Sequence, residues 1–452
     1  MPIDEKDEVQ AKTTPAHSSE SGPRAVLQHK SSSRNWLLFL LALVGAGWFL
    51  GPRCSHRMLR TPATLQDRVH NILTNTPLID GHDDFPILIR ERYHNHIYGS
   101  NFTESFIHGN LSGHVDLPRL RRGYVGGTFW SVFVPCPADG TDFSDENYAP
   151  SVRKTVEQVD LMARVQKAYP EIFSRPPNGT TALQAFQEGK IISPLGIEGL
   201  QSIGNSLAHL RMFYDMGVSY ATLTHNCHNK YADAALVELP GGGIKKADPI
   251  WHGVSPAGQD LIYEMNRLGM IIDLAHVSVQ TMRDVLGAGK SEWPGSRAPV
   301  IFSHSSAHAL CPHPRNVPDD VLALVEKTKS IVMVNFAPDF ISCTASDNDN
   351  GLPDTDLEHA TLERVADHIV HIGTVAGFDY VGLGSDFDGI PTTPQGLEDV
   401  SKFPDLIAEL LRRGVSDEDA GKVAGGNLLR VWRQVDQVAL EMQARGDHPA
   451  ED

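Results

Sequence analysis

The stretch Leu78-Ile-Asp-Gly-His-Asp-Asp84 is a short apolar run that ends in side chains able to bind a metal ion. Three later apolar runs end in the same way, at Glu198, His276 and His304. Runs of this length and β-branched content are typical of buried parallel strands. Reactive residues just beyond the strands are typical of a (β/α)8 barrel, whose active site lies at the C-terminal ends of the strands. Three histidines and two carboxylates converging there predict a transition-metal site, most simply a metal pair, and therefore a hydrolase.

Strand and helix patterns alternate from about residue 68 onward, which argues for a parallel sheet covered by helices. Eight strands are expected, at 77–81, 127–134, 191–197, 218–224, 270–275, 299–303, 330–336 and 380–385. Helical patterns between them include Asn147–Ala168, Gly204–Met216, Ala257–Leu268, Val317–Thr328 and Thr361–Ala376. Eight units fit a closed TIM-type barrel better than an open sheet, and no glycine-rich phosphate loop follows the first strand. The segment Tyr231–Ile250 is expected to be a long polar loop covering the mouth.

The length and charge of the chain bound its organisation. Its 452 residues are enough for one barrel plus extensions, and a formal charge of −17 argues against a nucleic-acid partner. The expected organisation is a disordered polar tail (1–34), a transmembrane signal-anchor segment (35–52), a stem (53–67), the catalytic barrel (68–440) and a polar C-terminal tail (441–452).

The segment Trp36–Leu50 is uncharged and apolar. It is at the short end of the ~17–25 residues that a membrane span requires, and the alternatives are a cleaved signal peptide or a buried helix. Trp36 and Trp48 are placed as interfacial anchors, but basic residues on both sides leave the orientation open. We expect a signal anchor with the catalytic domain extracytoplasmic, at the cell surface or in a secretory or vacuolar lumen. The C-terminal segment has no hydrophobic tail, so we expect no GPI anchor.

The five cysteines form no CxxC pair, which excludes a zinc finger and a thioredoxin-type motif. They are compatible either with independent buried thiols or with an oxidising compartment. Three N-glycosylation sequons lie beyond the hydrophobic segment and, together with it, favour the secretory route. Their asparagines are Asn101, Asn110 and Asn178.

Five residues carry the expected metal chemistry. His82 and Asp84 are two apart, so on a strand both side chains point to one face and can grip one metal ion. His276 and His304 suit a second ion, and Glu198, midway in the set, is the candidate bridge that holds two ions ~3.5–4 Å apart. Such a ligand set suits zinc, with manganese or cobalt as alternatives.

Three more polar residues follow expected strands or lie in the next loop: His225, Arg315 and Asp386. In isolation, His225 is more often a hydrogen-bonded core histidine and Arg315 more often a surface charge. An aspartate and three histidines lie close by in the sequence and are interpreted as residues that orient the metal ligands or lie in loops. They are Asp83, His228, His308 and His313.

These motifs, in order, resemble the membrane (renal) dipeptidase family from about residue 66 to 435. They are Leu78-Ile-Asp-Gly-His-Asp-Asp-Phe-Pro86, Gly196-Ile-Glu-Gly199, Thr222-Leu-Thr-His225, Asn266-Arg-Leu-Gly-Met-Ile-Ile-Asp-Leu-Ala-His-Val-Ser278, Ile301-Phe-Ser-His-Ser-Ser306, Arg315-Asn-Val-Pro-Asp-Asp320, Gly384-Ser-Asp-Phe-Asp-Gly389 and Gly426-Asn-Leu-Leu-Arg-Val431. The resemblance implies a zinc-dependent (β/α)8 barrel that hydrolyses dipeptides through a hydroxide shared by two zinc ions.

The resemblance also assigns roles to individual residues. His82, Asp84 and Glu198 match the ligands of one zinc ion, and Glu198, His276 and His304 match those of the second. His225 matches the group that stabilises the oxyanion, Arg315 the group that holds the substrate carboxylate, and Asp386 the acid near the amino group and the leaving nitrogen. Because the set is complete, an inactive homologue is disfavoured.

The same resemblance pairs Cys136 with Cys227 and Cys311 with Cys343, and leaves Cys54 over. It makes a homodimer the expected assembly, although the C-terminal cysteine that links family dimers is missing here. Cysteinyl-glycine and glutathione-derived conjugates are plausible substrates beside general dipeptides. Alternatives are another binuclear amidohydrolase, acting on a cyclic amide, lactone or ester, and a non-catalytic cell-surface binding protein. No lysine follows a middle strand, which disfavours a carbamate-bridged amidohydrolase.

Overall fold

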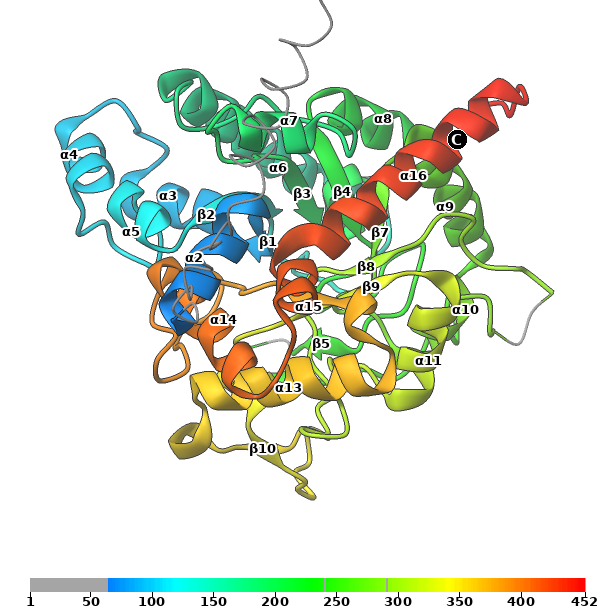
Figure 1. The fold of residues 1–452 in the computed structure, drawn as a ribbon. Coiled ribbons are helices and arrows are strands. Elements are labelled where there is room, and N and C mark those ends of the chain that lie inside the picture. Colours follow the sequence, from blue (N-terminus) through cyan, green and yellow to red (C-terminus); the bar gives the residue numbers. More distant parts are fainter. Residues whose placement is uncertain (1–63, 240, 290–291, 452) are drawn as a thin grey trace, which may run out of the picture. The chain divides into compact units, whose positions relative to one another are not determined.

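Eight parallel strands close into a barrel in the computed structural model, which describes residues 64–239, 241–289 and 292–451 (Figure 1). Around the barrel the order is β1-β12-β9-β8-β7-β4-β3-β2. Their bounds are β1 Leu78–Asp83, β2 Val125–Phe133, β3 Leu195–Glu198, β4 Val218–Thr222, β7 Ile271–Asp273, β8 Ile301–Phe302, β9 Ile331–Val334 and β12 Val381–Leu383. Each coincides with one of the eight predicted apolar runs, so the predicted (β/α)8 fold is confirmed.

Helices cover the outside of the barrel. They are α2 Leu65–Asn75, α3 Phe85–Tyr93, α4 Ser100–His108, α5 Leu117–Arg122, α6 Asp145–Ala168, α7 Ala182–Gln187, α8 Leu207–Asp215, α9 Pro256–Leu268, α10 Val279–Val285, α11 Asp319–Thr328, α12 Pro338–Ile341, α13 Leu362–Val375, α14 Phe403–Arg412, α15 Asp417–Gly421 and α16 Asn427–Ala444. Short turns are η1 Leu200–Ile203, η2 Leu357–His359, η3 Phe378–Tyr380, η4 Val400–Lys402 and the π-turn η5 Lys422–Gly426. The predicted helices agree to within three residues at each end. Side-chain caps fix several starts: Ser206, for example, accepts a hydrogen bond from the backbone N–H of His209, so α8 begins at Leu207.

The barrel interior is sealed at the amino-terminal ends of the strands by α16, which runs across the barrel in Figure 1. Trp432 of α16 packs against Phe129 of β2, with 4.9 Å between ring centroids. The side-chain amide of Asn427 donates to the carbonyl oxygens of Phe378 and Val381, at the start of β12. Because apolar side chains fill this end, the polar groups of the interior are left at the opposite, carboxyl end.

The segment 231–250 is more ordered than the predicted polar loop. It contains an antiparallel hairpin, β5 Leu236–Glu238 and β6 Ile244–Lys246. The buried carboxylate of Asp233 accepts backbone hydrogen bonds from Ile250, Trp251 and Gly253, which ties the two ends of the segment together. A second small pair joins β10 Cys343–Thr344 to β11 Asp354–Thr355.

The ends of the barrel domain lie slightly beyond the predicted limits of 68 and 440, since α2 begins at Leu65 and α16 ends at Ala444. The predicted polar tail 441–452 is also attached to the barrel. The backbone N–H of Ala450 donates to Glu264 of α9, and its carbonyl oxygen accepts from Arg211.

The predicted N-terminal polar tail 1–34, the signal-anchor segment 35–52 and most of the stem lie outside the described residues. Within the described ranges, no helix is long and apolar enough to cross a membrane. The membrane anchor and the extracytoplasmic location therefore stay predictions. So does N-glycosylation, although Asn101, Asn110 and Asn178 are all exposed.

Candidate active site

The polar residues singled out in the sequence meet at the carboxyl ends of the strands. His82 belongs to β1 and Asp84 follows it, Glu198 ends β3, and His276 and His304 lie just beyond β7 and β8. All five side chains are buried. His276 has a backbone φ of 65°, a left-handed conformation that is uncommon for residues other than glycine and that marks constrained sites.

Glu198 is the centre of this cluster. Its Oε1 lies 2.9 Å from Nε2 of His276, 3.5 Å from Nε2 of His304 and 3.7 Å from Nε2 of His82. The Nε2 atom of His82 also lies 3.3 Å from Oδ2 of Asp84. One carboxylate oxygen therefore faces three imidazole nitrogens, as a carboxylate shared between two metal ions would.

The hydrogen bonds on the far side of two rings identify which nitrogens are free. Ser303 Oγ donates to Asp273 and therefore accepts from Nδ1–H of His304, at 2.8 Å. Nδ1 of His276 donates to the side-chain oxygen of Asn226, at 3.1 Å. Burial lowers the pKa of both histidines well below the usual value, so each ring is neutral and its Nε2 is unprotonated.

These free nitrogens provide the test of whether the site fits a metal. Nε2 of His276 and Nε2 of His304 lie only 3.0 Å apart, so two lone pairs face each other unless a cation is between or beside them. Among the described residues, Oδ1 of Asp84 and Nε2 of His82 are buried without a hydrogen-bond partner. Burial opposes charge on His82, but Glu198 and Asp84 raise the pKa of His82 to about 10, and burial raises the pKa of Glu198 to about 8. His82 and Glu198 therefore hold a proton where a bound cation would take its place. The donor set fits a divalent transition metal.

His225 lies beside this cluster, and its side chain is slightly more exposed than those of the metal-ligand candidates. Its ring packs on His276, with 4.4 Å between centroids, and against Phe133, with 4.9 Å. Burial, and then the charge of Arg315, lower the pKa of His225 to about 3, so the imidazole is neutral at physiological pH. The Cys136–Cys227 disulfide, with 6.1 Å between its Cα atoms, ties the loop after β2 to the loop that carries His225.

Arg315 comes from the loop between β8 and α11 and is buried rather than exposed at the surface. Its guanidinium lies over the ring of Phe340, 4.9 Å from the centroid, and its Nη2 reaches the carbonyl oxygen of His304 at 3.5 Å. Burial lowers the pKa of Arg315 to about 10, which still leaves it charged near neutral pH. Its Nε has no hydrogen-bond partner among the described residues. A buried cation with a free donor has the chemistry to bind an anion.

Asp386 follows β12 and turns into the same space, again with a positive φ, of 65°. Its Oδ2 accepts from the side-chain amide of Asn335, at 3.0 Å. Ligand atoms of Asp386, His82 and His304 lie within 4.8 Å of one another. Burial raises the pKa of Asp386 to about 6. Every residue predicted for the site is thus brought to one place.

A cavity of about 770 Å³ is lined by Asn226 and Cys227, the residues that follow His225 in the chain. It is bounded by the loop from Cys136 to Thr141 and by the β5–β6 hairpin, and Asn226 lies at its inner wall. The hairpin residue Glu238 also lines the cavity and is 3.9 Å from Nδ1 of His225. Asn226, which bonds Nδ1 of His276, is the residue through which this cavity adjoins the cluster.

Several residues that hold the site together were not predicted from the sequence. Tyr220 on β4 contacts Nδ1 of His82 through its hydroxyl, at 2.8 Å. Asp273 on β7 fixes Ser303, and Asp80 on β1 likewise bonds Ser385. Asn335 holds Asp386. The available signal was a polar residue inside an apolar run, since Asp80 and Asp273 interrupt two predicted strands.

The four residues interpreted as supporting or loop groups differ in their surroundings. Asp83 accepts from the backbone N–H of Phe85, and His228 lies 3.1 Å from the carboxylate of Asp233. His313 accepts from the backbone N–H of Arg315. His308 is partly buried in the same loop.

Comparison with known proteins identifies the family of this chain. Residues 66–446 match the family model described as membrane dipeptidase, peptidase family M19. Dipeptidase aclJ of Aspergillus oryzae is 45% identical over 376 residues, which are 83% of this chain and 82% of that protein.

Solved structures agree. A metallo peptidase from Rhodobacter sphaeroides, liganded with a phosphinate mimic of the dipeptide L-Ala-D-Ala, is 25% identical with a TM-score of 0.65, covering 80% of this chain and 99% of that one. The dipeptidase AC, a family M19 metallo peptidase, is 26% identical with a TM-score of 0.64, covering 80% and 98%. The chain therefore belongs to the membrane dipeptidase family, peptidase family M19, and is a metal-dependent hydrolase that acts on dipeptides.

Proposed function

We propose that this protein hydrolyses dipeptides with two zinc ions that share Glu198. His82 and Asp84 complete one ligand set, and His276 and His304 complete the other. The observation that carries the proposal is the position of Glu198 Oε1, which lies 2.9, 3.7 and 3.5 Å from the Nε2 atoms of His276, His82 and His304. When bound, such a metal pair supplies a water molecule of lowered pKa as the nucleophile and polarises the substrate carbonyl.

The protein groups around the pair orient the substrate. Neutral His225 is a hydrogen-bond donor at the edge of the metal cluster, where the carbonyl oxygen gains negative charge during attack. Asp386, held by Asn335, is the acid placed to bind the substrate amino group and to protonate the leaving nitrogen. Arg315 binds the free carboxylate through its unpaired donor. Because Arg315 binds the substrate carboxylate and Asp386 binds its amino group, the distance between them restricts the substrate to dipeptides.

Among dipeptides, cysteinyl-glycine and glutathione-derived conjugates are included in the proposal because the cavity lined by Glu238, which is 3.9 Å from Nδ1 of His225, offers room for a side chain. The bacterial relative that binds a mimic of L-Ala-D-Ala supports testing dipeptides with a D-residue as well.

The decisive experiment measures metal and activity on the same preparations of the full chain. We expect two zinc ions per chain, hydrolysis of a dipeptide panel and loss of both after treatment with a chelator. Glu198→Gln should lose at least one ion together with hydrolysis, whereas Glu188→Gln, at an exposed position on the barrel, is the matched control. Near-normal turnover by Glu198→Gln with both metals bound would overturn the bridged assignment.

We also propose, from the sequence alone, that residues 35–52 anchor the chain and place the barrel outside the cytosol, as a homodimer. The apolar segment and the three exposed sequons support the first part. Sensitivity of intact cells or vesicles to a membrane-impermeant protease and to an N-glycosidase tests the location, and analytical ultracentrifugation tests the dimer.

A further inference from the structure

The position of Arg315 is set by a short loop, not by a strand. Residues 306–317 leave β8 and return, with the N–H of Val317 bonded to the carbonyl of Ser306 and the N–H of His308 bonded to the carbonyl of Val317. Within the loop, the N–H of Arg315 donates to Nδ1 of His313. Phe340, whose ring underlies the guanidinium, belongs to α12, a separate segment. The position of the Arg315 guanidinium therefore depends on how the loop 306–317 and α12 are held relative to each other.

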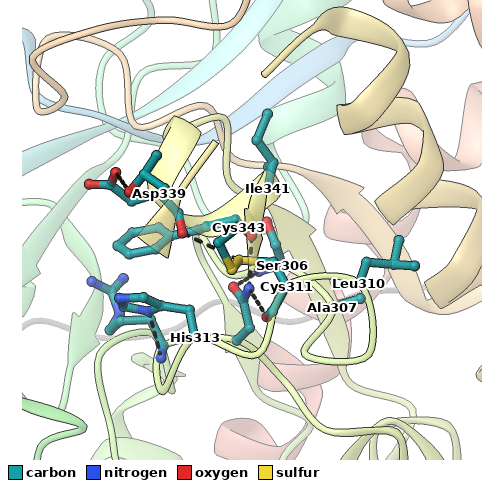
Figure 2. The surroundings of a disulfide bond; sticks show 12 residues. Ser306, Ala307, Leu310, Cys311, His313, Asp339, Ile341 and Cys343 are labelled. Carbon is teal, nitrogen blue, oxygen red and sulfur yellow. Dashed lines mark hydrogen bonds between the residues drawn. A yellow bond between two sulfur atoms is a disulfide. The ribbon is translucent and has the colours of Figure 1, made fainter. Parts of the chain in front are cut away.

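The Cys311–Cys343 disulfide joins these two segments (Figure 2), with 5.1 Å between the Cα atoms. Cys311 is buried in the Arg315 loop, and Cys343 lies just beyond α12. Beside the disulfide, the buried side chain of Asn316 donates to the carbonyl oxygens of Cys311 and Phe340, at 2.9 and 2.8 Å. Asn316 thus bridges the same two segments by hydrogen bonds.

A third connection comes from α13. The imidazole of His368 is completely buried and lies between the two segments: Nδ1 accepts from the backbone N–H of Ala307 at 3.0 Å, and Nε2 donates to the carbonyl oxygen of Ile341 at 2.9 Å. Burial lowers the pKa of His368 to about 4, in keeping with a neutral ring that accepts at one nitrogen and donates at the other. Arg364, one turn earlier, donates to the carbonyls of Ile341 and Leu310.

We propose that the Cys311–Cys343 disulfide and His368 are positioning groups for Arg315, which together fix the site that binds the carboxylate of the substrate. Neither touches the reacting atoms. This inference rests on the proposed role of Arg315 as the carboxylate clamp. It predicts that loosening the two segments weakens recognition of the carboxylate selectively and leaves the metal cluster, which is carried by the strand ends, intact.

The readout is carboxylate discrimination, defined as kcat/KM for a free dipeptide such as Ala-Ala divided by kcat/KM for the same dipeptide with a C-terminal amide. Because small misplacement of a binding group is costly, Cys311→Ala/Cys343→Ala and His368→Leu should each lower this ratio on the order of tenfold, through KM of the free dipeptide. Metal content per chain should not change. His368→Asn, which keeps an acceptor near the place of Nδ1, should recover part of the loss.

Two matched controls separate positioning from general loosening. His371→Gln alters a histidine on the same helix that pairs with Asp319 near the surface. Cys136→Ala/Cys227→Ala removes the other disulfide, which lies beside His225. Both should leave the discrimination ratio unchanged, even where the second lowers kcat.

The same variants on an Arg315→Ala background decide the outcome. We expect Arg315→Ala alone to abolish discrimination, and the disulfide and His368 variants to have no further effect on it. If Arg315→Ala preserves discrimination, the proposed clamp itself is wrong. If Arg315→Ala abolishes it but the other variants leave it intact in the parent protein, or lower it equally with and without Arg315, the positioning role is refuted. Should the cysteine variant fail to fold, the His368 variants test the positioning role by the same criteria.

Discussion

Replacing Tyr220 by Phe removes a single hydroxyl group from behind a proposed metal ligand. Tyr220 is fully buried on β4, and its oxygen lies 2.8 Å from Nδ1 of His82. If Nε2 of His82 binds a metal ion, Nδ1 carries the proton and donates to the tyrosine oxygen. The phenylalanine ring keeps the packing against Phe129, so the change removes only the hydroxyl's hydrogen bonds, to His82 and to Ser303.

The magnitude follows from that geometry. The variant leaves a buried N–H without its partner, which costs about 1–3 kcal/mol. Because the metal-bound form requires this tautomer, most of the cost falls on metal binding, and a loss of roughly 10–100-fold in affinity is expected, in the range typical of such partners. Competition with a chromogenic chelator measures the dissociation constant of each ion.

Tyr148→Phe, at another buried tyrosine, on α6, is the matched control and should leave metal affinity unchanged. The melting temperature of the metal-free protein shows whether Tyr220→Phe also affects the fold. If Tyr220→Phe binds both ions within twofold of the parent protein, then either His82 is not a ligand through Nε2 or Tyr220 does not orient it.

Three further outcomes test the fold and the site. Trp432→Ala should lower the free energy of unfolding by about 3–5 kcal/mol, because it leaves a cavity where α16 packs against Phe129 at the end of the barrel. Leu440→Ala, at an exposed position on the same helix, is the control, and a urea titration measures both. Glu264→Gln should lower the free energy of unfolding by about 1–3 kcal/mol at neutral pH. Burial raises the pKa of Glu264, but Arg267, the N–H of Ala450 and Arg211 outweigh it and lower the pKa. The stabilisation by Glu264 is therefore present above its unfolded-state pKa, near 4.5, and is lost as the pH falls through its folded-state pKa. The stability difference between Glu264→Gln and the parent should therefore shrink on acidification, and a constant difference would contradict the pairing. Asp386→Asn should lower kcat by about 10²–10⁴-fold with bound metal retained, measured by steady-state kinetics and metal analysis; unchanged kcat would remove Asp386 from the proton transfer.

Much of this structure is local enough to be predicted from the sequence. Each barrel strand is a short, buried, apolar run, so its place along the chain is visible without knowing its neighbours. The ligand candidates follow these runs directly, and the right-handed parallel arrangement brings all carboxyl ends to one face. His82, Glu198, His276 and His304 therefore come together as a consequence of position alone.

Other features depend on contacts between residues far apart in the chain. Ordering of the segment 231–250 depends on Asp233, whose backbone partners are about twenty residues away, and attachment of the C-terminal residues depends on Glu264 of α9. Neither produces a periodic pattern. The polar residues at these positions are indistinguishable in the sequence from solvated ones.

The sequence by itself determined the barrel, the order of its strands along the chain and the residues that end them, because hydrophobic burial imposes a repeat that can be read locally. Only the tertiary structure decided how those residues work together. It showed which nitrogen of His276 and His304 is free, since Asn226 and Ser303 take the other one. It also placed Arg315 inside the protein, in a loop that a disulfide and a buried histidine join to a second segment. Tautomer, charge and orientation are set by neighbours in space, and those neighbours exist only once the chain has folded.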